Sequence, residues 1–185
     1  MIQETLREAE ERMKKAVEAT QHEFSLIRTG RANPAILEHV RVDAYGTTLP
    51  LNQVASISVP EPRQLLITPF DRNILSHIEK GILKSDVGIT PTNDGSALRL
   101  NIPPLNEERR KELIKQVHQK AEQGRASIRT VRHEAIKKLQ AAKKASEISE
   151  NEEKRAEEQV QKLVDKYTAE IDHLMKVKEA ELMEV

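Results

Sequence analysis

Three long stretches of the sequence repeat apolar side chains at alternating steps of three and four residues. This spacing places the repeated side chains on one face of an α-helix, so it predicts amphipathic helices over residues 2–28, 105–144 and 149–183. The repeated positions are Ile2, Leu6, Ala9, Met13, Ala16 or Val17, Thr20, Phe24 and Ile27; Leu113, Val117, Ala121, Gly124, Ile128, Val131, Ala135 and Leu139; and Ala156, Val160, Leu163, Tyr167, Ile171, Leu174 and Val177. Because each apolar face must be buried against another element, we expect an elongated, antiparallel three-helix bundle.

Residues that favour helix starts stand at the predicted boundaries. Pro103 and Pro104 prevent an earlier start of the second helix, and Asn106 is a suitable N-cap. Ser149 and Glu152 match a capping box at the start of the third helix. The capping signals therefore agree in phase with the apolar repeats.

Gly124 lies on the apolar face of the predicted second helix. One interpretation is that the missing side chain lets the neighbouring helices approach closely. The alternative is a weak point in the helix interior, which costs about 1 kcal/mol relative to alanine.

Residues 31–104 follow a different pattern. They are predicted to form a small, β-rich α/β domain inserted into a bundle domain of residues 1–30 and 105–185, which makes the fold class α+β. The expected elements are β-strands within residues 39–46, 53–60 and 64–70, a helix at residues 71–85 capped by Asp71, and a hairpin at residues 88–103. The hairpin is expected because Asp94-Gly95 is a strong short turn signal.

Two connections, residues 30–34 and 102–105, join the insert to the bundle. Prolines stiffen both connections, whereas Gly30 and its neighbours are expected to absorb a rotation. Gly30 also stands where glycine commonly ends a helix, and a continuing helix would carry Arg31 onto the apolar face. The predicted hinge residues are Gly30, Ala32, Asn33, Pro34, Pro103 and Pro104.

A strong charge asymmetry lies within a formal net charge of zero. Residues 105–145 carry 12 Lys/Arg and 5 Asp/Glu, whereas residues 146–185 carry 6 and 12. A helical projection gathers six cationic or titratable side chains on one flank of the second helix: Lys111, His118, Arg125, Arg129, Arg132 and Lys143. This flank either binds the phosphates of an RNA backbone or is a solvated surface paired with the acidic third helix.

Several function classes lack their characteristic residues. The chain has no cysteine, no GxxxxGK phosphate loop and no HExxH, so we expect no metal, no cofactor, no small-molecule substrate and no catalytic residues. No apolar run approaches ~18 residues and the N-terminus has no apolar signal core, so we expect a cytoplasmic protein without a membrane span. Aromatic residues make up only 2% of the chain, so stacking on RNA bases is not expected. Any RNA contact is expected to recognise the backbone and the shape of the RNA.

Motifs along the whole chain resemble those of bacterial ribosome recycling factors, and several lie at junctions between predicted elements. They are IRTGRANP (27–34), YG (45–46), PL followed by Q (50–53), IEKGI (78–82), SDVG (85–88), NDG (93–95), PPLNEERRKEL (103–113), AEQGRASIRTVR (121–132), ISENE (148–152) and KEAELMEV (178–185). The sequence departs from the family pattern at four positions: Ala44, Asn106, Thr130 and His133. The last departure replaces a fixed charge and is expected to weaken one peripheral contact or make it sensitive to pH.

This resemblance implies a fold, a function and a set of partners. The family fold is an L-shaped, two-domain molecule in which a flexible hinge joins a three-helix bundle to a small inserted domain. The implied function is to bind the post-termination 70S ribosome and, with elongation factor G and its GTP hydrolysis, to split it into subunits, as a monomer that is not an enzyme. The positions that match family arginines contacting large-subunit rRNA are Arg28, Arg31, Arg110, Arg129 and Arg132; Arg125 joins them from the cationic flank. A non-enzymatic helical adaptor that docks other proteins is the alternative, and a hydrolase has only abundant carboxylates and histidines in its favour.

Overall fold

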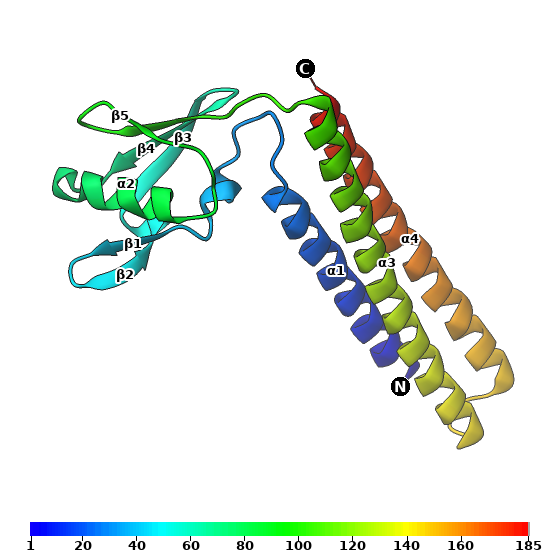
Figure 1. Ribbon diagram of the computed structural model, residues 1–185. Coiled ribbons are helices and arrows are strands. Elements are labelled where there is room, and N and C mark those ends of the chain that lie inside the picture. The colour runs from blue at the N-terminus through cyan, green and yellow to red at the C-terminus, as the bar shows by residue number, and fades with distance from the viewer. Residues whose placement is uncertain (185) are drawn as a thin grey trace. The chain divides into compact units, whose positions relative to one another are not determined.

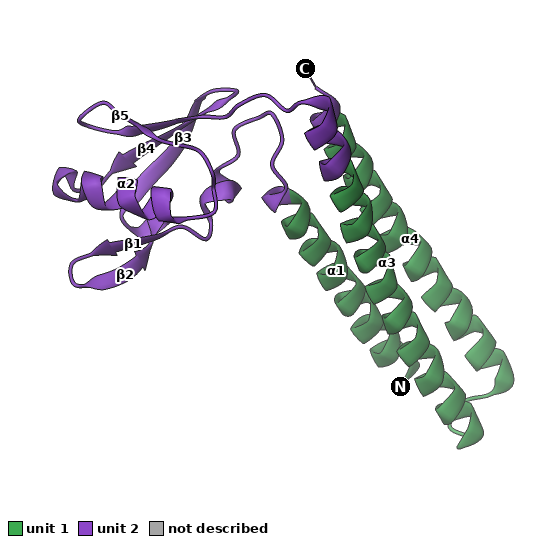
Figure 2. Ribbon diagram, in the orientation of Figure 1, with its two compact units in different colours: residues 1–24, 114–180 green, residues 25–113, 181–185 purple. Residues whose placement is uncertain are grey.

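The structure is a computed structural model that describes residues 1–184. The chain divides into two compact units, coloured separately in Figure 2: residues 1–24 with 114–180, and residues 25–113 with those from 181 on. The second unit includes the ends of the long helices together with the insert. The units therefore change after residues 24, 113 and 180, whereas the predicted domains change after residues 30 and 104. The predicted boundaries after residues 30 and 104 stay a prediction, and Val185, the last residue of the predicted bundle domain, lies outside the described residues.

Three long helices supply the whole of the first unit (Figure 1). Their bounds are α1 Ile2–Leu26, α3 Glu107–Lys144 and α4 Glu150–Met183. Along α1 and α3 the ion pairs run in opposite order, since Glu8 meets Lys138 whereas Glu23 meets Lys120, at 3.1 and 3.3 Å. The predicted antiparallel packing of α3 is therefore confirmed.

The predicted apolar repeats form the core of the bundle. Side chains from all three helices are fully buried, including Met13, Ile128 and Ile171. One predicted core position is wrong, because Val177 is 44% exposed while Lys178 is only 7% exposed. The buried face of α4 continues from Ile171 to Lys178, so the aliphatic stem of a lysine takes the position that the apolar pattern assigned to valine.

Gly124 lies where α3 meets both other helices. A Cβ at this position would overlap Thr20 Oγ1 and lie 2.9 Å from Ile171 Cδ1. The close approach predicted for this glycine is therefore confirmed.

The predicted capping residues hold both later helices at their starts. Asn106 Oδ1 accepts the backbone N–H of Arg109 at 2.6 Å at the start of α3. Before α4, Ser149 Oγ accepts the N–H of Glu152 at 3.1 Å, and the Glu152 carboxylate accepts the N–H of Ser149 at 3.0 Å. The capping box is therefore confirmed.

The first helix ends earlier than the sequence predicts. It ends at Leu26, four residues before Gly30, and Gly30 is absent from the residues with positive φ. The helix predicted over residues 2–28 is therefore two residues too long at this end, and Gly30 is not the left-handed C-cap that its position suggested. The apolar step to Ile27 misled the prediction: this residue is buried, yet it follows the last helical turn.

The second unit holds two antiparallel sheets and a short helix. The strands are β1 Arg41–Ala44, β2 Thr47–Pro50, β3 Ala55–Glu61, β4 Gln64–Pro69, β5 Thr92–Asn93 and β6 Leu98–Asn101, and the helix is α2 Leu75–Lys84. One sheet pairs β1 with β2, and the other has the order β3-β4-β6-β5. Alternate residues of the central strands are buried, as in Leu65 and Ile67, and they share a core with Ile78 and Ile82 of α2. The long helices and small antiparallel sheets confirm the α+β fold class.

Turn residues explain both the confirmed and the missed hairpins. The β5–β6 hairpin is confirmed, and Gly95 has a φ of +92° within its loop. The β1–β2 hairpin escaped the prediction, although Tyr45 and Gly46 both have positive φ, 55° and 75°, as the tightest two-residue turns require. Asp71 caps the helical segment as predicted, by accepting the N–H of Asn73 at 2.9 Å, but this segment starts with a 3-10 turn before α2.

Candidate nucleic-acid interface

Within the second unit, Arg110 contacts the last turn of α4 and Arg31 contacts Glu184, which follows that turn. Arg110 Nε donates to the backbone carbonyl of Leu182 at 2.8 Å, which satisfies one of the carbonyls that a helix end leaves unpaired. Arg31 forms two short contacts with Glu184, Nε to Oε2 at 2.7 Å and an Nη2 hydrogen bond to Oε1 at 2.8 Å. Arg110 therefore has a structural contact, while Arg31, 60% exposed, remains open to solvent around its ion pair.

Arg28 is the predicted site residue whose charge is least compensated. Its Nε is buried and has no hydrogen-bond partner. Burial, and then the neighbouring charge of Arg109, lower the pKa of Arg28. An unpaired donor beside a like charge is unfavourable in the protein alone, and an anion would supply both the missing acceptor and the opposite charge.

Arg125 is turned toward α4 and held there. Its Nε and Nη2 donate to Asp172 Oδ1 at 2.8 and 2.6 Å, and its side chain is only 22% exposed. Desolvation opposes the charge, but the hydrogen bond and attraction of Asp172, followed by those of Glu122, outweigh it and raise the pKa of Arg125. This arginine already has a carboxylate partner, as the paired-helix interpretation expected.

Arg129 and Arg132 remain at the surface of α3. Arg129 donates to Glu122 at 2.6 Å and keeps 58% of its side chain exposed. The hydrogen bond and then the charge of Arg129 are the main causes that lower the pKa of Glu122. Arg132 Nε donates to the neutral Gln161 at 2.9 Å, so its positive charge is not neutralised by this contact.

The remaining members of the cationic flank divide between two helices. His118 pairs with Glu179 of α4, whereas Lys111 pairs within its own helix with Glu107 at 3.7 Å. Lys143 lies in the last turn of α3, where a cation is favourable. Ion pairs with the acidic helix α4 thus account for Arg125 and His118, whereas Arg129 pairs with Glu122 of its own helix and Arg132 meets only a neutral side chain of α4.

The two connections are bonded at some of their residues. The N–H of Ala32 donates to Pro62 O at 2.7 Å, and Asn33 uses both ends of its amide, accepting from the N–H of Ala35 at 3.0 Å and donating to Ser25 O at 3.1 Å. Asn33 is extended, as Pro34 requires. By contrast, a Cβ placed on Gly30 would meet nothing within 4 Å.

The second connection has one backbone bond before its prolines. The N–H of Ile102 donates to Arg63 O at 2.8 Å. Pro103 and Pro104 follow without regular structure and have no N–H to donate. Gly30 thus has open space where a side chain would stand, whereas Pro103 and Pro104 are stiff but lack backbone N–H groups that could bond to their surroundings.

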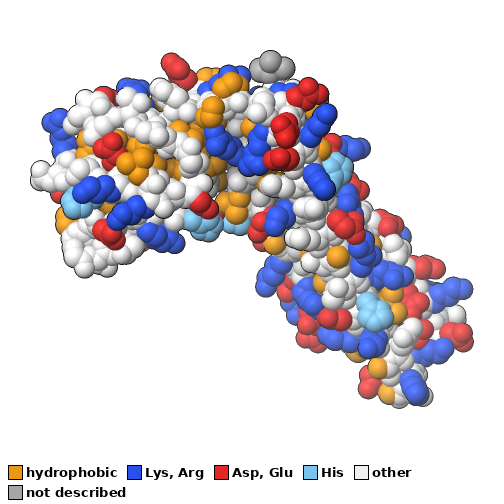
Figure 3. Space-filling view, in the orientation of Figure 1, with side chains coloured by type: hydrophobic (Ala, Val, Ile, Leu, Met, Phe, Trp, Pro, Cys, Tyr) orange, Lys and Arg blue, Asp and Glu red, His pale blue; other side chains and the backbone are white. Residues whose placement is uncertain are grey.

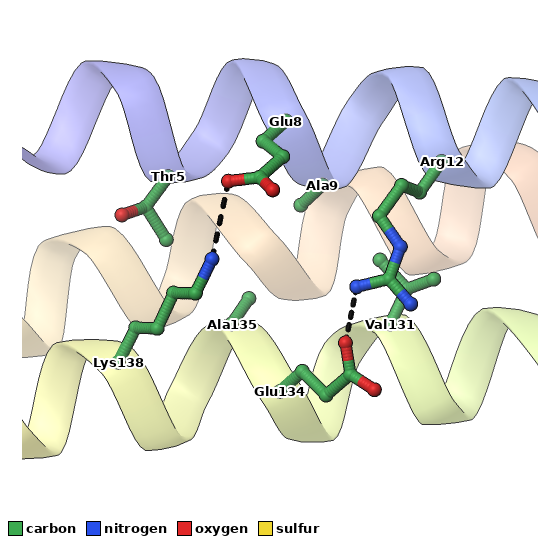
Figure 4. Close-up of a pocket in the computed structure, with 8 residues that line it drawn as sticks. All are labelled: Thr5, Glu8, Ala9, Arg12, Val131, Glu134, Ala135 and Lys138. Carbon is green, nitrogen blue, oxygen red and sulfur yellow. Dashed lines mark hydrogen bonds and ion pairs between the residues drawn. The ribbon is translucent and has the colours of Figure 1, made fainter.

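Charged side chains also line the contact between α1 and α3, as Figure 4 shows. Arg12 pairs with Glu134, and Lys138 donates to Glu8 at 3.1 Å. The cavity beside them measures about 10 Å³, enough for at most one water molecule, so this cluster holds helices together rather than a substrate.

Residues 1–184 contain neither an arranged cluster of metal ligands nor a membrane-spanning helix. Within these residues, no group of three or more histidine, aspartate or glutamate side chains is arranged to hold a metal ion. None of the helices in this part of the chain combines the length and apolar character needed to cross a membrane.

Sequence reasoning missed Arg109, which neighbours Arg28 and pairs with Glu112 at 2.9 Å. The signal was present, because Arg109 precedes Arg110 in the quoted EERR motif. The roles of Leu182 and Glu184 had no such signal, since they depend on where the end of α4 meets residues far away in the sequence.

The chain is similar to known proteins along most or all of its length. A sequence model for the family "Ribosome recycling factor" matches residues 20–183. The ribosome-recycling factor of Roseiflexus castenholzii is 52% identical over 185 residues, which is 100% of both chains. That of Rubrobacter xylanophilus is 54% identical over 180 residues, 97% of each chain.

Two solved structures are similar over the whole of this chain. A solution structure of a ribosome recycling factor has 42% identity and a TM-score of 0.79, and 98% of its chain is covered. The second has 46% identity, a TM-score of 0.69 and 100% coverage of its chain. It presents the T. thermophilus ribosome recycling factor and the E. coli elongation factor G bound to the E. coli post-termination complex.

Proposed function

Because this chain belongs to the ribosome recycling factor family, we propose that it binds the post-termination ribosome and splits it into subunits. Elongation factor G and its GTP hydrolysis supply the energy, while this protein contributes binding and movement without catalysing a reaction itself. The relative in complex with elongation factor G and a post-termination ribosome supports this proposal. We further propose that it works as a cytoplasmic monomer without a cofactor or small-molecule substrate.

The observation that carries the proposal is the uncompensated charge of Arg28. Its buried Nε lacks an acceptor and Arg109 lies close by. A phosphate of large-subunit rRNA would accept hydrogen bonds from the guanidinium and offset the repulsion between the two arginines.

The other proposed rRNA contacts differ in what binding requires. Arg129 and Arg132 are exposed and need only exchange a surface partner. Arg31 must share or leave Glu184, and Arg125 must leave Asp172, its partner at 2.6 Å. We therefore expect Arg129 and Arg132 to contribute more to affinity than Arg125, with Arg110 positioning the end of α4.

The proposed movement is a rotation at the two connections. Gly30 has free space around it, and Pro103-Pro104 is a stiff segment without N–H groups. Ala32, Asn33 and Pro34 would keep the start of the insert in place while the neighbouring bonds turn, since Ala32 and Asn33 are hydrogen-bonded.

A splitting assay with purified ribosomes tests the proposal. Post-termination ribosomes are mixed with the protein, elongation factor G and GTP, and subunits are followed by light scattering. We expect splitting only when all components are present, and strong impairment in an Arg129→Gln/Arg132→Gln variant. Normal splitting without this protein, or no splitting with it, would refute the proposed function.

Salt dependence distinguishes this function from that of a protein-docking adaptor. Contacts with ~4–6 phosphates predict a log–log slope of affinity against salt of roughly −3 to −5, at ~0.7–0.9 per phosphate. A flat slope, together with unchanged affinity of the Arg129→Gln/Arg132→Gln variant, would favour the adaptor.

A further inference from the structure

A second group of cations lies in the insert, on α2 and β1. Arg41, His77, Lys80 and Lys84 line a hollow of about 240 Å³ together with Asp43 and Gly81. On the face shown in Figure 3, Lys, Arg and His side chains gather over α2 and the β1–β2 hairpin. The hollow belongs entirely to the second unit.

Close packing of α2 on β1 creates this arrangement. A Cβ on Gly81 would lie 2.6 Å from the backbone oxygen of Arg41, so any larger residue would push helix and strand apart. His77, Lys80 and Lys84 follow one another at steps of three and four, which places them on the helix face that borders Arg41. The hollow is therefore built by the fold and does not depend on flexible loops.

The cations of the hollow have little internal compensation. Within residues 1–184, the side chains of His77, Lys80 and Lys84 form no hydrogen bond or ion pair, and the Arg41 side chain donates only to the nearby backbone carbonyls of Glu38 and Val40. The one acid in the lining, Asp43, accepts a hydrogen bond from Thr48 at 2.9 Å. The hollow thus keeps an excess of exposed positive charge.

We propose that this hollow binds the phosphate backbone of RNA, as a second contact separate from the bundle arginines. Cations that converge without an acidic partner fit phosphates, and they read no sequence. A protein partner fits less well, because protein interfaces are depleted in lysine and centre on aromatic or apolar anchors, which the lining lacks. The inference rests on the proposed function for the source of RNA, which is the ribosome.

A charge-removal pair with a matched control measures the contact. Lys80→Gln/Lys84→Gln removes two charges from the hollow, and Arg63→Gln/Arg72→Gln removes two exposed charges outside it. We expect the first variant to lower the log–log salt slope of ribosome binding by roughly 1.5, from two phosphates at ~0.7–0.9 each, and the control to match the unmodified protein. An unchanged slope in the first variant, or an equal change in the control, overturns the inference; absence of ribosome binding by the unmodified protein refutes the proposed function instead.

A tethered probe identifies the class of partner. Because the chain has no cysteine, Ser76→Cys, one helical turn before Lys80, provides a single attachment point for an iron chelate that generates hydroxyl radicals. Cleavage of rRNA near the probe, reduced by the Lys80→Gln/Lys84→Gln change, supports the inference. Cleavage confined to a ribosomal protein, or no cleavage while the protein is bound, shows that the hollow does not face RNA.

Discussion

Arginines that lie close together in the sequence of this protein have different partners in the structure. Arg125 and Arg129 lie one turn apart on α3. Arg125 Nη2 pairs with Asp172 Oδ1 at 2.6 Å, whereas the Arg129 side chain is 58% exposed. Within residues 1–184, the buried Nε of Arg28 has no hydrogen-bond acceptor. An arginine without a partner in the free protein loses least when it binds a phosphate.

Arg28→Ala is expected to reduce ribosome affinity about tenfold or more, since hydrogen bonds to charged groups contribute roughly 1.5–3 kcal/mol. Thermal stability should stay nearly unchanged, because the folded protein already leaves the Nε unpaired. Equilibrium binding and thermal unfolding of the same sample measure both effects, with Arg63→Ala as a control for an exposed charge elsewhere. Loss of folding would assign Arg28 a structural role instead.

Gly124→Ala is expected to destabilise the bundle even though alanine is the better helix former. Overpacking costs about 1–3 kcal/mol, against a gain of about 1 kcal/mol in helix propensity. The added Cβ would overlap Thr20 Oγ1, so the double change Gly124→Ala/Thr20→Ala should recover part of the loss. Denaturant unfolding of the two single variants and the double variant gives the coupling; purely additive effects would argue against the clash.

At the scale of elements, short polar side chains hold turns and helix starts in place. Asn106 and Ser149 hold the starts of α3 and α4. Asp94 does the same for the loop between β5 and β6, where one carboxylate oxygen accepts the N–H groups of Ser96 and Ala97 at 2.9 and 2.8 Å. These elements are therefore stabilised by bonds that begin and end within a few residues.

The Asp94 loop is expected to loosen in acid. Hydrogen bonds from the backbone N–H groups of Ser96 and Ala97, with smaller effects from the Ser96 hydroxyl and Arg99, lower the pKa of Asp94 from 3.8 to about 2. Its stabilising effect is therefore complete above pH 3.8 and is lost as the pH falls through about 2. Hydrogen exchange of the Ser96 and Ala97 amides should accelerate over this range relative to an amide of β4. Asp94→Asn should remove the dependence on pH, and an identical profile in that variant would contradict this explanation.

At the scale of the whole molecule, two chain connections, residues 30–34 and 102–105, join the long helices to the inserted sheets. The first combines an unconstrained Gly30 with the hydrogen-bonded Ala32 and Asn33, and the second contains Pro103 and Pro104. Within the first connection, a residue with open space around it thus lies two residues before others that are held by hydrogen bonds. A rotation at such a place changes few hydrogen bonds, which suits a proposed movement driven by a partner.

Gly30→Ala tests the proposed rotation. The new Cβ would meet nothing within 4 Å and Gly30 has no positive φ, so folding and ribosome binding should be unaffected. Alanine has fewer backbone conformations than glycine, so splitting at saturating protein should be slower. Ala32→Gly, which loosens the opposite side of the connection, serves as the control. Equal splitting rates for Gly30→Ala and the unmodified protein would place the rotation elsewhere.

The sequence by itself determined the features that depend on nearby residues. Apolar spacing identified three helices, capping residues marked the starts of α3 and α4, and Asp94-Gly95 marked a hairpin. These signals work because helix geometry, caps and turns are controlled by side chains only a few positions apart. Motifs spread along the chain also identified the family, since they combine many such local requirements.

Only the tertiary structure decided which distant groups meet. It buried Lys178 rather than Val177, ended α1 at Leu26 and paired Arg125 with Asp172. Within residues 1–184, it left the Nε of Arg28 without an acceptor. Each outcome depends on the rotation and register of one helix against another, which change a side chain's surroundings without changing its sequence neighbours. The sequence could therefore predict where cations stand along the helices, whereas the fold decided which of them have partners within the protein.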